Sequence, residues 1–297
     1  MIRILSLCLF IFLVSVLDRH LLKANHGFSL HIIEAPIPSL PDPNPTLPFP
    51  KNLFDQSFHY LGKGAQSFVF ESQDQKTVLK FYRFPSHLRR FPWTHHPLGY
   101  LFSSSRKNVK EYNLKRLKLS FHSFYLAAQS LSHETAVLYV HLHPTEELHQ
   151  KAHLIDRLGA HYHLPLDSIA FIVQQRGTSF LPEFKKAFAL QDHAKCKQML
   201  DSLIHLIRQR CLHNISDLDN MDNDNYGWLH GRAIHLDIGR FQETHPLNPQ
   251  EEILRITHPL TTYLLEVSPE LHNYFLLSIQ KATGFAGSQA AGWTRSS

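Results

Sequence analysis

A glycine-containing turn that is followed by a strand-like segment constrains the fold more than any other feature. Gly62 and Gly64 precede Phe68-Val69-Phe70, whose β-branched and aromatic side chains favour a strand. Glycine lets a backbone approach phosphates closely and present N–H donors without interference from a Cβ. In a dinucleotide-binding βαβ unit a helix follows the glycines, so the strand found here argues against that fold. The segment instead predicts a hairpin with a glycine turn.

The next strand-like segment, Thr77 to Tyr82, places a lysine within apolar sequence. Lys80 is costly at such a position unless its ammonium group finds a partner. Glu111 is a candidate partner, because it lies beside the apolar stripe of the next predicted helix. Two alternatives stay open: Lys80 lies on a solvated strand face, and Glu111 pairs along its own helix with Lys107 or Lys115.

Hydrophobic periodicity predicts a mixture of strands and helices along the rest of the chain. Strands are expected within 58–82, at 136–141, at 169–174 and at 233–236. Helices are expected over 103–128 and 190–212, with two or three more after the last strand. The pattern predicts an α+β protein in which a small antiparallel sheet comes first and helices follow.

The first residues form an apolar segment with a basic start, and its continuous apolar run extends from Ile4 to Leu17. Spanning a bilayer takes about 20 apolar residues, whereas shorter runs are typical of signal-peptide cores. We expect residues 1–24 to be a signal peptide or an N-terminal membrane anchor. The protein is then membrane-associated through this segment, or it is secreted, on a side of the membrane that the flanking charges do not fix.

Residues 35–50 are rich in proline. The prolines are Pro36, Pro38, Pro41, Pro43, Pro45, Pro48 and Pro50. Such a segment favours polyproline II with a rise of about 3.1 Å per residue, which predicts a semi-rigid linker of roughly 50 Å. The folded domain is therefore expected over 51–285. Residues 286–297, which are rich in small side chains, are expected to form a flexible tail.

Charge and histidine content set limits on partners. The formal charge of +5 and the pI near 9.0 are only moderately basic, and the basic run from Arg106 to Lys118 is typical of a solvated helix face. Nucleic acid is therefore not an expected partner. Histidine is abundant at 23 residues, with pairs such as His161 and His163 that would share one face of a strand. We interpret these pairs as ordinary surface histidines, because spacing fixes no further metal ligand beside them.

An acidic segment in the second half of the chain carries the most distinctive chemistry. Five carboxylates and three amides crowd this stretch: Asp217, Asp219, Asp222, Asp224 and Asp237, with Asn220, Asn223 and Asn225. The segment fails as an EF-hand, since it lacks the glycine at position 6 and the glutamate at position 12. A few hard oxygen ligands, completed by phosphate oxygens and water, suit Mg²⁺ instead.

Taken in this order, these motifs resemble a divergent protein-kinase-like fold with two lobes. Leu61 to Val69 resembles the glycine-rich loop, and Lys80 resembles the strand lysine that contacts the α- and β-phosphates, with Glu111 as its partner on the helix. Gln174-Gln175-Arg176 resembles the hinge that meets adenine, with Gln175 as the candidate contact. The resemblance implies an N-lobe over about 51–174 and a reduced helical C-lobe over about 177–285. ATP and Mg²⁺ are the implied cofactors.

The same resemblance implies Asn225 and Asp237, in the sequence Leu-Asp-Ile-Gly, as the metal ligands. The catalytic aspartate of the family would fall at Asn220, so Asp219 is our first choice as the base and Asp217 the second. Two functions stay open. One is a phosphotransferase that acts on a hydroxyl of an unknown protein or small molecule, and the other is an inactive pseudokinase that serves as a membrane-associated or secreted binding or scaffold module.

Overall fold

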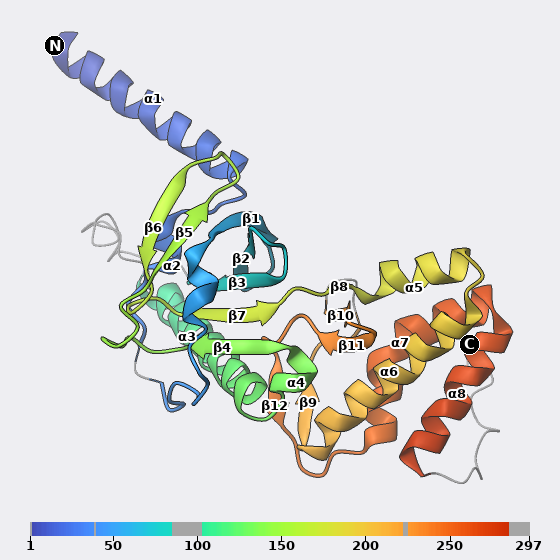
Figure 1. Cartoon of the computed structure of the whole chain (residues 1–297). Helices are drawn as coiled ribbons and strands as arrows, with labels where there is room; N and C mark the ends of the chain where they lie inside the picture. The colour runs from blue at the N-terminus through green and yellow to red at the C-terminus, as the bar shows by residue number, and fades with distance from the viewer. Residues whose placement is uncertain (1, 39, 85–102, 222–224, 285–297) are drawn as a thin grey trace. The chain divides into compact units, whose positions relative to one another are not determined.

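The structure of the protein is a computed structural model that describes residues 2–38, 40–84, 103–221 and 225–284 (Figure 1). The chain divides into two compact units. Unit 1 comprises Met1–Phe121 and Val137–Arg176, and unit 2 comprises His122–Ala136 and Gly177–Ser297. Residues 122–136 belong to unit 2 although they precede the lobe boundary expected near 174–177, and the expected lobes stay a prediction. The expected tail at 286–297 lies outside the described residues.

The described strands of unit 1 form a sheet in the order β4-β7-β3-β2-β1-β5-β6 (Figure 1). Their bounds are β1 (Ser57–Lys63), β2 (Ser67–Ser72), β3 (Thr77–Tyr82), β4 (Val137–His141), β5 (Lys151–Ile155), β6 (His161–Pro165) and β7 (Phe171–Gln175). Every neighbouring pair is antiparallel except β1 and β5, which run parallel. The hairpins predicted within 58–82 are therefore present, while β5 and β6 extend the sheet beyond the prediction.

One face of this sheet builds the core of unit 1. Alternate residues of the strands point to that face, so Phe58, Phe70 and Phe81 are fully buried. Phe28, which precedes the sheet in sequence, packs edge-on against Phe70 at 5.0 Å between ring centroids. Aromatic pairs of this kind stabilise a core beyond the area that they bury.

The residues before β1 form α1 (Ile2–Ala24), α2 (Leu30–Ile33) and the 3-10 helix η1 (Lys51–Asp55). The end of α1 is fixed to the sheet, because the side-chain amide of Asn25 donates to Asp156 at 2.8 Å. Along α1, apolar side chains such as Leu9, Phe12 and Leu17 are exposed. Within the part of the chain that the structure describes, no helix has both the length and the hydrophobicity that are needed to cross a membrane.

The proline-rich residues, which composition predicts to be a semi-rigid linker, contact unit 1. Phe49 stacks on Phe54 at 5.2 Å and contacts Tyr139 edge-on at 5.1 Å. Asn44 accepts hydrogen bonds from the backbone N–H groups of Leu142 and His143 at 2.6 and 2.9 Å. Apolar and amide side chains between the prolines thus fasten the segment to unit 1, and packing of unit 1 begins near Phe28 instead of Lys51.

Two helices follow the first hairpins, α3 (Ser103–Gln129) and α4 (Ser132–Thr135). The predicted helix over 103–128 is therefore present as α3. Its Phe121 packs against Tyr82 of β3 with the ring centroids 5.4 Å apart. Its Ser123 belongs to unit 2, where the hydroxyl donates to the carbonyl of Ile238 and accepts from the N–H of Phe241.

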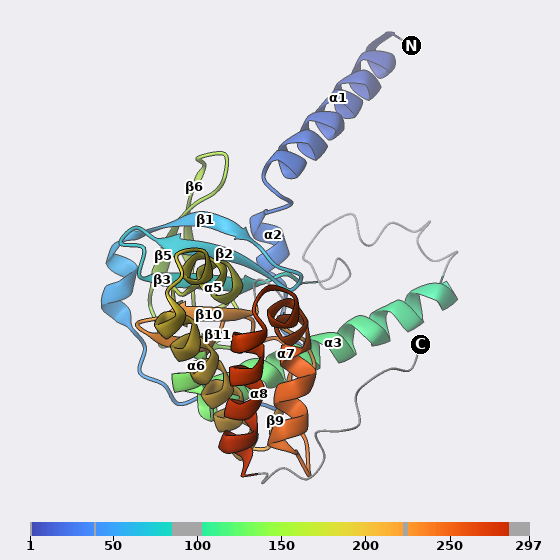
Figure 2. The same cartoon turned by 90° about the vertical axis from the view of Figure 1, so that its right-hand side faces the viewer.

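Unit 2 is built mainly from helices, of which α6, α7 and α8 lie side by side (Figure 2). The bounds are α5 (Phe180–Ala189), α6 (His193–Leu212), α7 (Pro249–Val267) and α8 (Pro269–Thr283). Asp192, Asn248 and Ser268 cap the starts of α6, α7 and α8 by accepting from backbone N–H groups of the first turn. The helix predicted over 190–212 is α6, and its apolar stripe forms the core of the unit.

Short strands accompany these helices: β8 (Thr178–Ser179), β9 (Ile215–Asp217), β10 (Tyr226–Leu229), β11 (Arg232–His235) and β12 (Phe241–Glu243). The order β11-β10-β8 forms one small sheet, and β12 pairs with β9. The chain thus combines a sheet-rich unit with a helix-rich unit, which confirms the predicted α+β class.

Candidate functional site

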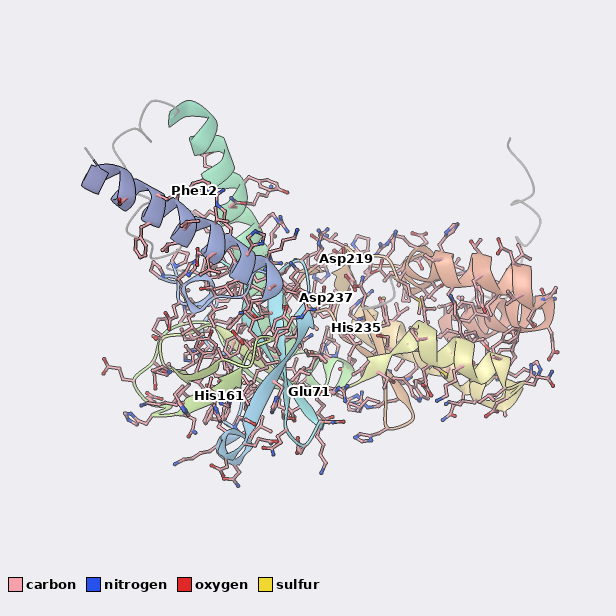
Figure 3. All side chains as sticks on the ribbon, turned by 90° about the horizontal axis from the view of Figure 1, so that it is seen from above. Phe12, Glu71, His161, Asp219, His235 and Asp237 are labelled. Carbon is pink, nitrogen blue, oxygen red and sulfur yellow. The ribbon has the colours of Figure 1, made fainter. Side chains whose placement is uncertain are left out.

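The acidic segment of unit 2 lies between two antiparallel strand pairs. In the pairing of β9 with β12, Asp217 lies opposite Phe241, and in the pairing of β10 with β11, Tyr226 lies opposite His235. These registers bring the residues after β9, before β10 and after β11 to one place, where Asp219 and Asp237 are found (Figure 3). Asp222, Asn223 and Asp224, which belong to the same acidic segment, lie outside the described residues.

Asn225 and Asp237, the predicted metal ligands, are neighbours in space. The backbone carbonyl of Asn225 accepts from the N–H groups of Leu236 and Asp237 at 2.8 and 3.3 Å. The side-chain amide of Asn225 donates to the carbonyl of Asn220 at 2.9 Å, which directs its Oδ1 away from that bond. Asp237 is exposed, and its Oδ1 accepts a hydrogen bond from the N–H of Gly239 at 3.0 Å.

This donor set fits Mg²⁺. The ion prefers oxygen ligands in near-octahedral geometry and usually keeps several waters beside one or two carboxylates. Asp237 supplies a carboxylate and Asn225 an amide oxygen, from two backbone segments that hydrogen bonds hold together. Within the described residues, no group of three or more histidine, cysteine, aspartate or glutamate side chains is arranged to hold a metal ion. A magnesium ion at this place would therefore need phosphate oxygens or water as further ligands.

Asp219, our first choice as a base, is half-buried beside these residues. Its N–H donates to Oδ1 of Asp217 at 3.0 Å, which fixes the backbone at this point. Its own carboxylate forms an ion pair with Arg240, Nε to Oδ1, at 3.4 Å. The carboxylate of Asp219 therefore faces Arg240, which follows Asp237 in the chain and is partly exposed.

Asp217, our second choice, has a different environment. Its side chain is buried, and its Oδ2 lies 3.4 Å from the fully buried guanidinium of Arg210. Burial raises the pKa of the Asp217 carboxyl to about 6, although Arg210 lowers it. A carboxylate that is enclosed in this way is suited to hold the segment in place more than to meet an acceptor molecule.

Glu252 of α7 completes this buried network, and sequence analysis did not find it. Its Oε1 accepts from Nη2 of Arg210 at 2.7 Å, from the hydroxyl of Ser216 at 3.1 Å and from the N–H of Asp217 at 3.1 Å. Its Oε2 accepts from Nε and Nη2 of Arg255 at 3.0 and 2.8 Å. One buried carboxylate thus fixes β9 to two helices, directly before Asp219.

Arg255 extends the network to the acidic segment itself. Its guanidinium donates to the backbone carbonyl of Asp217 at 2.5 Å and to Oδ1 of Asn220 at 3.2 Å. Arg210 in turn donates through Nε to the carbonyl of Ile215 at 3.1 Å. The residues that lead into the acidic segment are therefore held through their carbonyls by two arginines, both ion-paired with Glu252.

Two aromatic groups close the buried side of this network. Tyr226 and His235 are fully buried, with ring centroids 4.9 Å apart. Burial lowers the pKa of His235 well below its ordinary value, and the charge of Arg210 lowers it further, so the imidazole is neutral at pH 7. Burial likewise raises the pKa of the Tyr226 hydroxyl far above its ordinary value, with Asp217 adding to the effect. The cationic charge at the centre of the network therefore belongs to Arg210.

In unit 1, Gly62 and Gly64 lie at the predicted hairpin turn between β1 and β2. The N–H of Gly64 donates to the carbonyl of Ser67 at 2.9 Å, and Arg83 donates to the carbonyl of Gly64 at 2.8 Å. A Cβ added to either glycine would meet no heavy atom within 4 Å, and neither residue has a positive φ. The turn itself therefore does not require glycine, and contact with phosphates remains a prediction.

Lys80 lies in the centre of β3, where it is half-buried and paired in register with Val69 of β2 and Ile172 of β7. Glu111 is exposed on α3. The pairing of Lys80 with Glu111 stays a prediction.

The predicted hinge residue Gln175 ends β7 and lies opposite Thr77 of β3. The next residue, Arg176, forms an ion pair with Glu71, which Figure 3 labels, at 2.5 Å between Nε and Oε1. The N–H of Arg176 donates to the carbonyl of Lys76 at 2.9 Å. The end of unit 1 is thereby fixed to the sheet, whereas contact of Gln175 with adenine stays a prediction.

Comparison with known proteins gives structural matches of low identity. No protein-family model matches the chain, and no curated protein matches it. Among solved structures, the bifunctional kinase-methyltransferase WbdD matches with a TM-score of 0.39 and 15% identity, over 79% of this chain and 48% of that one. Rv3197 of Mycobacterium tuberculosis, in complex with erythromycin, matches with a TM-score of 0.34 and 11% identity, over 81% of this chain and 58% of that one. The chain thus spans about half the length of WbdD.

Proposed function

We propose that this protein binds ATP with Mg²⁺ and transfers a phosphoryl group to a hydroxyl of a protein or small molecule. The observation that carries this function is the arrangement in unit 2, where backbone hydrogen bonds join Asn225 to the residue Asp237 and Asp219 lies on the adjoining segment. Two oxygen donors held in this way suit a magnesium ion that is completed by phosphate oxygens and water. When bound, the ion would neutralise charge on the phosphates.

Residues of both units have roles in this function. Backbone N–H groups of the turn at Gly62 and Gly64 bind phosphate oxygens, and the ammonium of Lys80 binds the α- and β-phosphates. Gln175 contacts the adenine. The carboxylate of Asp219 accepts the proton of the acceptor hydroxyl, while Asp217 holds the segment from its buried position. Glu111 is the proposed partner of Lys80 when nucleotide is bound, because apo contacts of this kind often form only in the complex.

A second function, a pseudokinase that binds nucleotide and serves as a scaffold, has its own supporting observation. Asp217 is enclosed by Arg210, and Asp219 is ion-paired with Arg240, so each candidate base already has a cationic partner. Catalysis at such a site consists mostly of positioning and charge neutralisation. A chain that lacks an accessible base would then bind nucleotide without turnover.

The test is calorimetric titration of the full chain with ATP, with and without Mg²⁺, followed by an assay of ATP hydrolysis and phosphate transfer. We expect binding that requires Mg²⁺. Lys80→Ala and Asp237→Asn should each abolish it, whereas Lys76→Ala, at an exposed position just before β3, should not. Absence of ATP binding in the unaltered protein would refute both functions.

Turnover separates the two functions. A phosphotransferase should hydrolyse or transfer phosphate, and Asp219→Asn should remove that activity while ATP binding persists. Binding without turnover in the unaltered protein supports the scaffold. If Asp219→Asn keeps full activity while Asp217→Asn abolishes it without unfolding the chain, the assignment of the base to Asp219 is wrong.

We further propose that the N-terminal segment addresses the protein to a membrane or to export. The supporting observation is the exposure of apolar side chains along α1, among them Leu9, Phe12 and Leu17. Mass spectrometry of the mature protein tests this. Retention of residues from Met1 in a membrane fraction indicates association through α1, and a start near residue 25 in the secreted fraction indicates export. An intact chain that is found only in the soluble fraction of the cell would contradict both.

A further inference from the structure

Three histidines gather on the outward face of the hairpin formed by β5 and β6. His153 of β5 lies directly opposite His163 of β6, and His161 lies two positions before His163 on the same strand. Residues two apart in a strand share a face, so the three imidazoles lie together. Their neighbours Ala152 and Leu154 are fully buried on the other face, which leaves the histidines on the solvent side.

The imidazoles are in direct contact. Nε2 of His153 lies 2.9 Å from Nδ1 of His161, which is a hydrogen-bond distance between two ring nitrogens. The ring of His163 stacks on that of His153 with 4.7 Å between centroids and 19° between planes. Two neutral imidazoles can make the nitrogen contact only when one nitrogen donates and the other accepts. At least one lone pair in the contact is therefore directed at the partner ring.

Charge on this face favours neutral rings. Partial burial and the nearby His163, His161 and His59 lower the pKa of His153 below its ordinary value. By register, Lys151 of β5 lies on the same face of the sheet. On the neighbouring strands, Glu71 of β2 lies opposite His59 of β1. The carboxylate of Glu71 is ion-paired with Arg176. No carboxylate is ion-paired with His153, His161 or His163 among the described residues. A neutral imidazole has the nitrogen lone pair that a metal ion needs.

We propose that Nε2 of His153 and Nδ1 of His161 bind one divalent late transition-metal ion, of the class of Ni²⁺ or Cu²⁺, as adjacent ligands. The geometry selects the class. With metal–nitrogen bonds of about 2.0–2.1 Å, nitrogens 2.9 Å apart subtend an angle of about 90° at the metal. That angle suits tetragonal Cu²⁺ or Ni²⁺, whereas a tetrahedral zinc site would need nitrogens about 3.3 Å apart.

Water completes the coordination, because the described residues offer no group of three or more ligand side chains. The site is therefore a two-imidazole site of moderate affinity. When the ion binds, the proton that lies between the two nitrogens moves through water to the other nitrogen of its ring. Two neutral rings thus become two neutral ligands with no net release of protons. Only a deprotonated imidazole nitrogen can bind the ion, so affinity falls as pH falls.

Such an ion would tie β5 to β6 on the hairpin that also holds the end of α1. Asp156, in the turn between these strands, accepts from the side chain of Asn25 at 2.8 Å, and Arg157 contacts His26. Because the metal binds the folded hairpin and not the unfolded chain, it should stabilise the hairpin in proportion to its occupancy.

The experiment uses the full chain without an affinity tag, freed of metal by chelation and titrated with NiCl₂ by calorimetry near neutral pH. We expect one equivalent of Ni²⁺ per chain to bind with moderate affinity. His153→Ala and His161→Ala should each weaken its binding by about tenfold or more, since each removes one of two ligands. His205→Ala removes an exposed histidine of α6 in unit 2 and is the matched control, with unchanged binding expected.

A second readout keeps the result independent of stability. The Cu²⁺ complex of the unaltered protein should show two nitrogen ligands in its electron paramagnetic resonance spectrum, and the His161→Ala complex should show one. Lys80→Ala should leave Ni²⁺ binding unchanged, so failure of the nucleotide function would not affect this test. The proposal is overturned if the chain binds no Ni²⁺, or if the His153→Ala and His161→Ala variants bind it as the His205→Ala control does.

Discussion

The buried carboxylate of Glu252 offers the sharpest test of how unit 2 is held together. We consider Glu252→Gln, which keeps the size of the side chain and removes its charge. The carboxylate accepts five hydrogen bonds, from Arg210, Ser216, Asp217 and Arg255, at distances between 2.7 and 3.1 Å. In a glutamine an N–H₂ group replaces one of the two carboxylate oxygens, and this group cannot accept hydrogen bonds. Either the bonds to Oε1 or those to Oε2 are therefore lost, whichever way the amide turns.

The magnitude follows from the burial of the partners. Arg210 is fully buried, and after the substitution its remaining carboxylate would be Asp217 at 3.4 Å. Breaking a buried ion pair by neutralising one member costs about 3–5 kcal/mol, because an uncompensated charge remains. We therefore expect Glu252→Gln to lower the free energy of unfolding of unit 2 by about 3–5 kcal/mol.

The neighbouring residue provides the control. Glu251 lies one position earlier on α7, is exposed and accepts one hydrogen bond, from Asn248 at 3.1 Å. Glu251→Gln should cost less than about 1 kcal/mol. Urea unfolding of both variants, followed by the fluorescence of Trp228 in β10, measures the difference, with Trp93 and Trp293 replaced by Phe in both. Equal unfolding midpoints for the two variants would refute the reasoning that the buried network stabilises this unit.

Three further substitutions test other parts of the fold by chemical denaturation. Asp217→Asn should flatten the pH dependence of stability between about pH 4 and 6. Because folding raises the pKa of this carboxyl from 3.8 to about 6, the unaltered protein loses roughly 3 kcal/mol as pH rises through this window; a dependence that persists in the variant would contradict this assignment. Gly227→Ala should cost about 1–3 kcal/mol of stability, because the added Cβ would lie 2.7 Å from the side chain of Leu236. Gly62→Ala is its control: the added Cβ would meet no atom within 4 Å, so stability should change by less than about 0.5 kcal/mol. Phe28→Ala should destabilise unit 1 by about 3–5 kcal/mol, since Phe28 is 1% exposed, and a neutral result would show that the folded part begins later.

The first hairpins and the long helices could be predicted because each has a strong local signal. Glycine and polar turns separate apolar strands in β1 to β3, and apolar spacing of three and four residues marks α3 and α6. The strands β5 and β6 escaped prediction for a physical reason. Histidines occupy their outward positions, so each offers only two or three inward apolar residues to the pattern, such as Ala152 and Leu154.

The buried charges of the candidate site could not be assigned from local pattern alone. A signal did exist for Arg210, which lies three positions after Ile207 and seven after Leu203 and so falls on the apolar stripe of α6. A charged residue on such a stripe requires a buried partner. Its partner Glu252 is 42 positions away on α7, and only the tertiary structure brings the two together.

The contrast between Asp217 and Asp219 bears on whether the protein is active. For Asp217 to reach an acceptor, its contact with the buried Arg210 would have to break, which costs several kcal/mol in a network of this kind. For Asp219 to reach an acceptor, its partly exposed ion pair with Arg240 at 3.4 Å would have to break, and such pairs contribute about 0–1 kcal/mol. Breaking this pair is a small barrier beside the energies of the proposed phosphoryl transfer, so the pairing with Arg240 does not by itself argue against the proposed enzyme. Under the proposed function, the choice between enzyme and scaffold depends on whether a bound nucleotide would draw Arg240 away from Asp219, the proposed base.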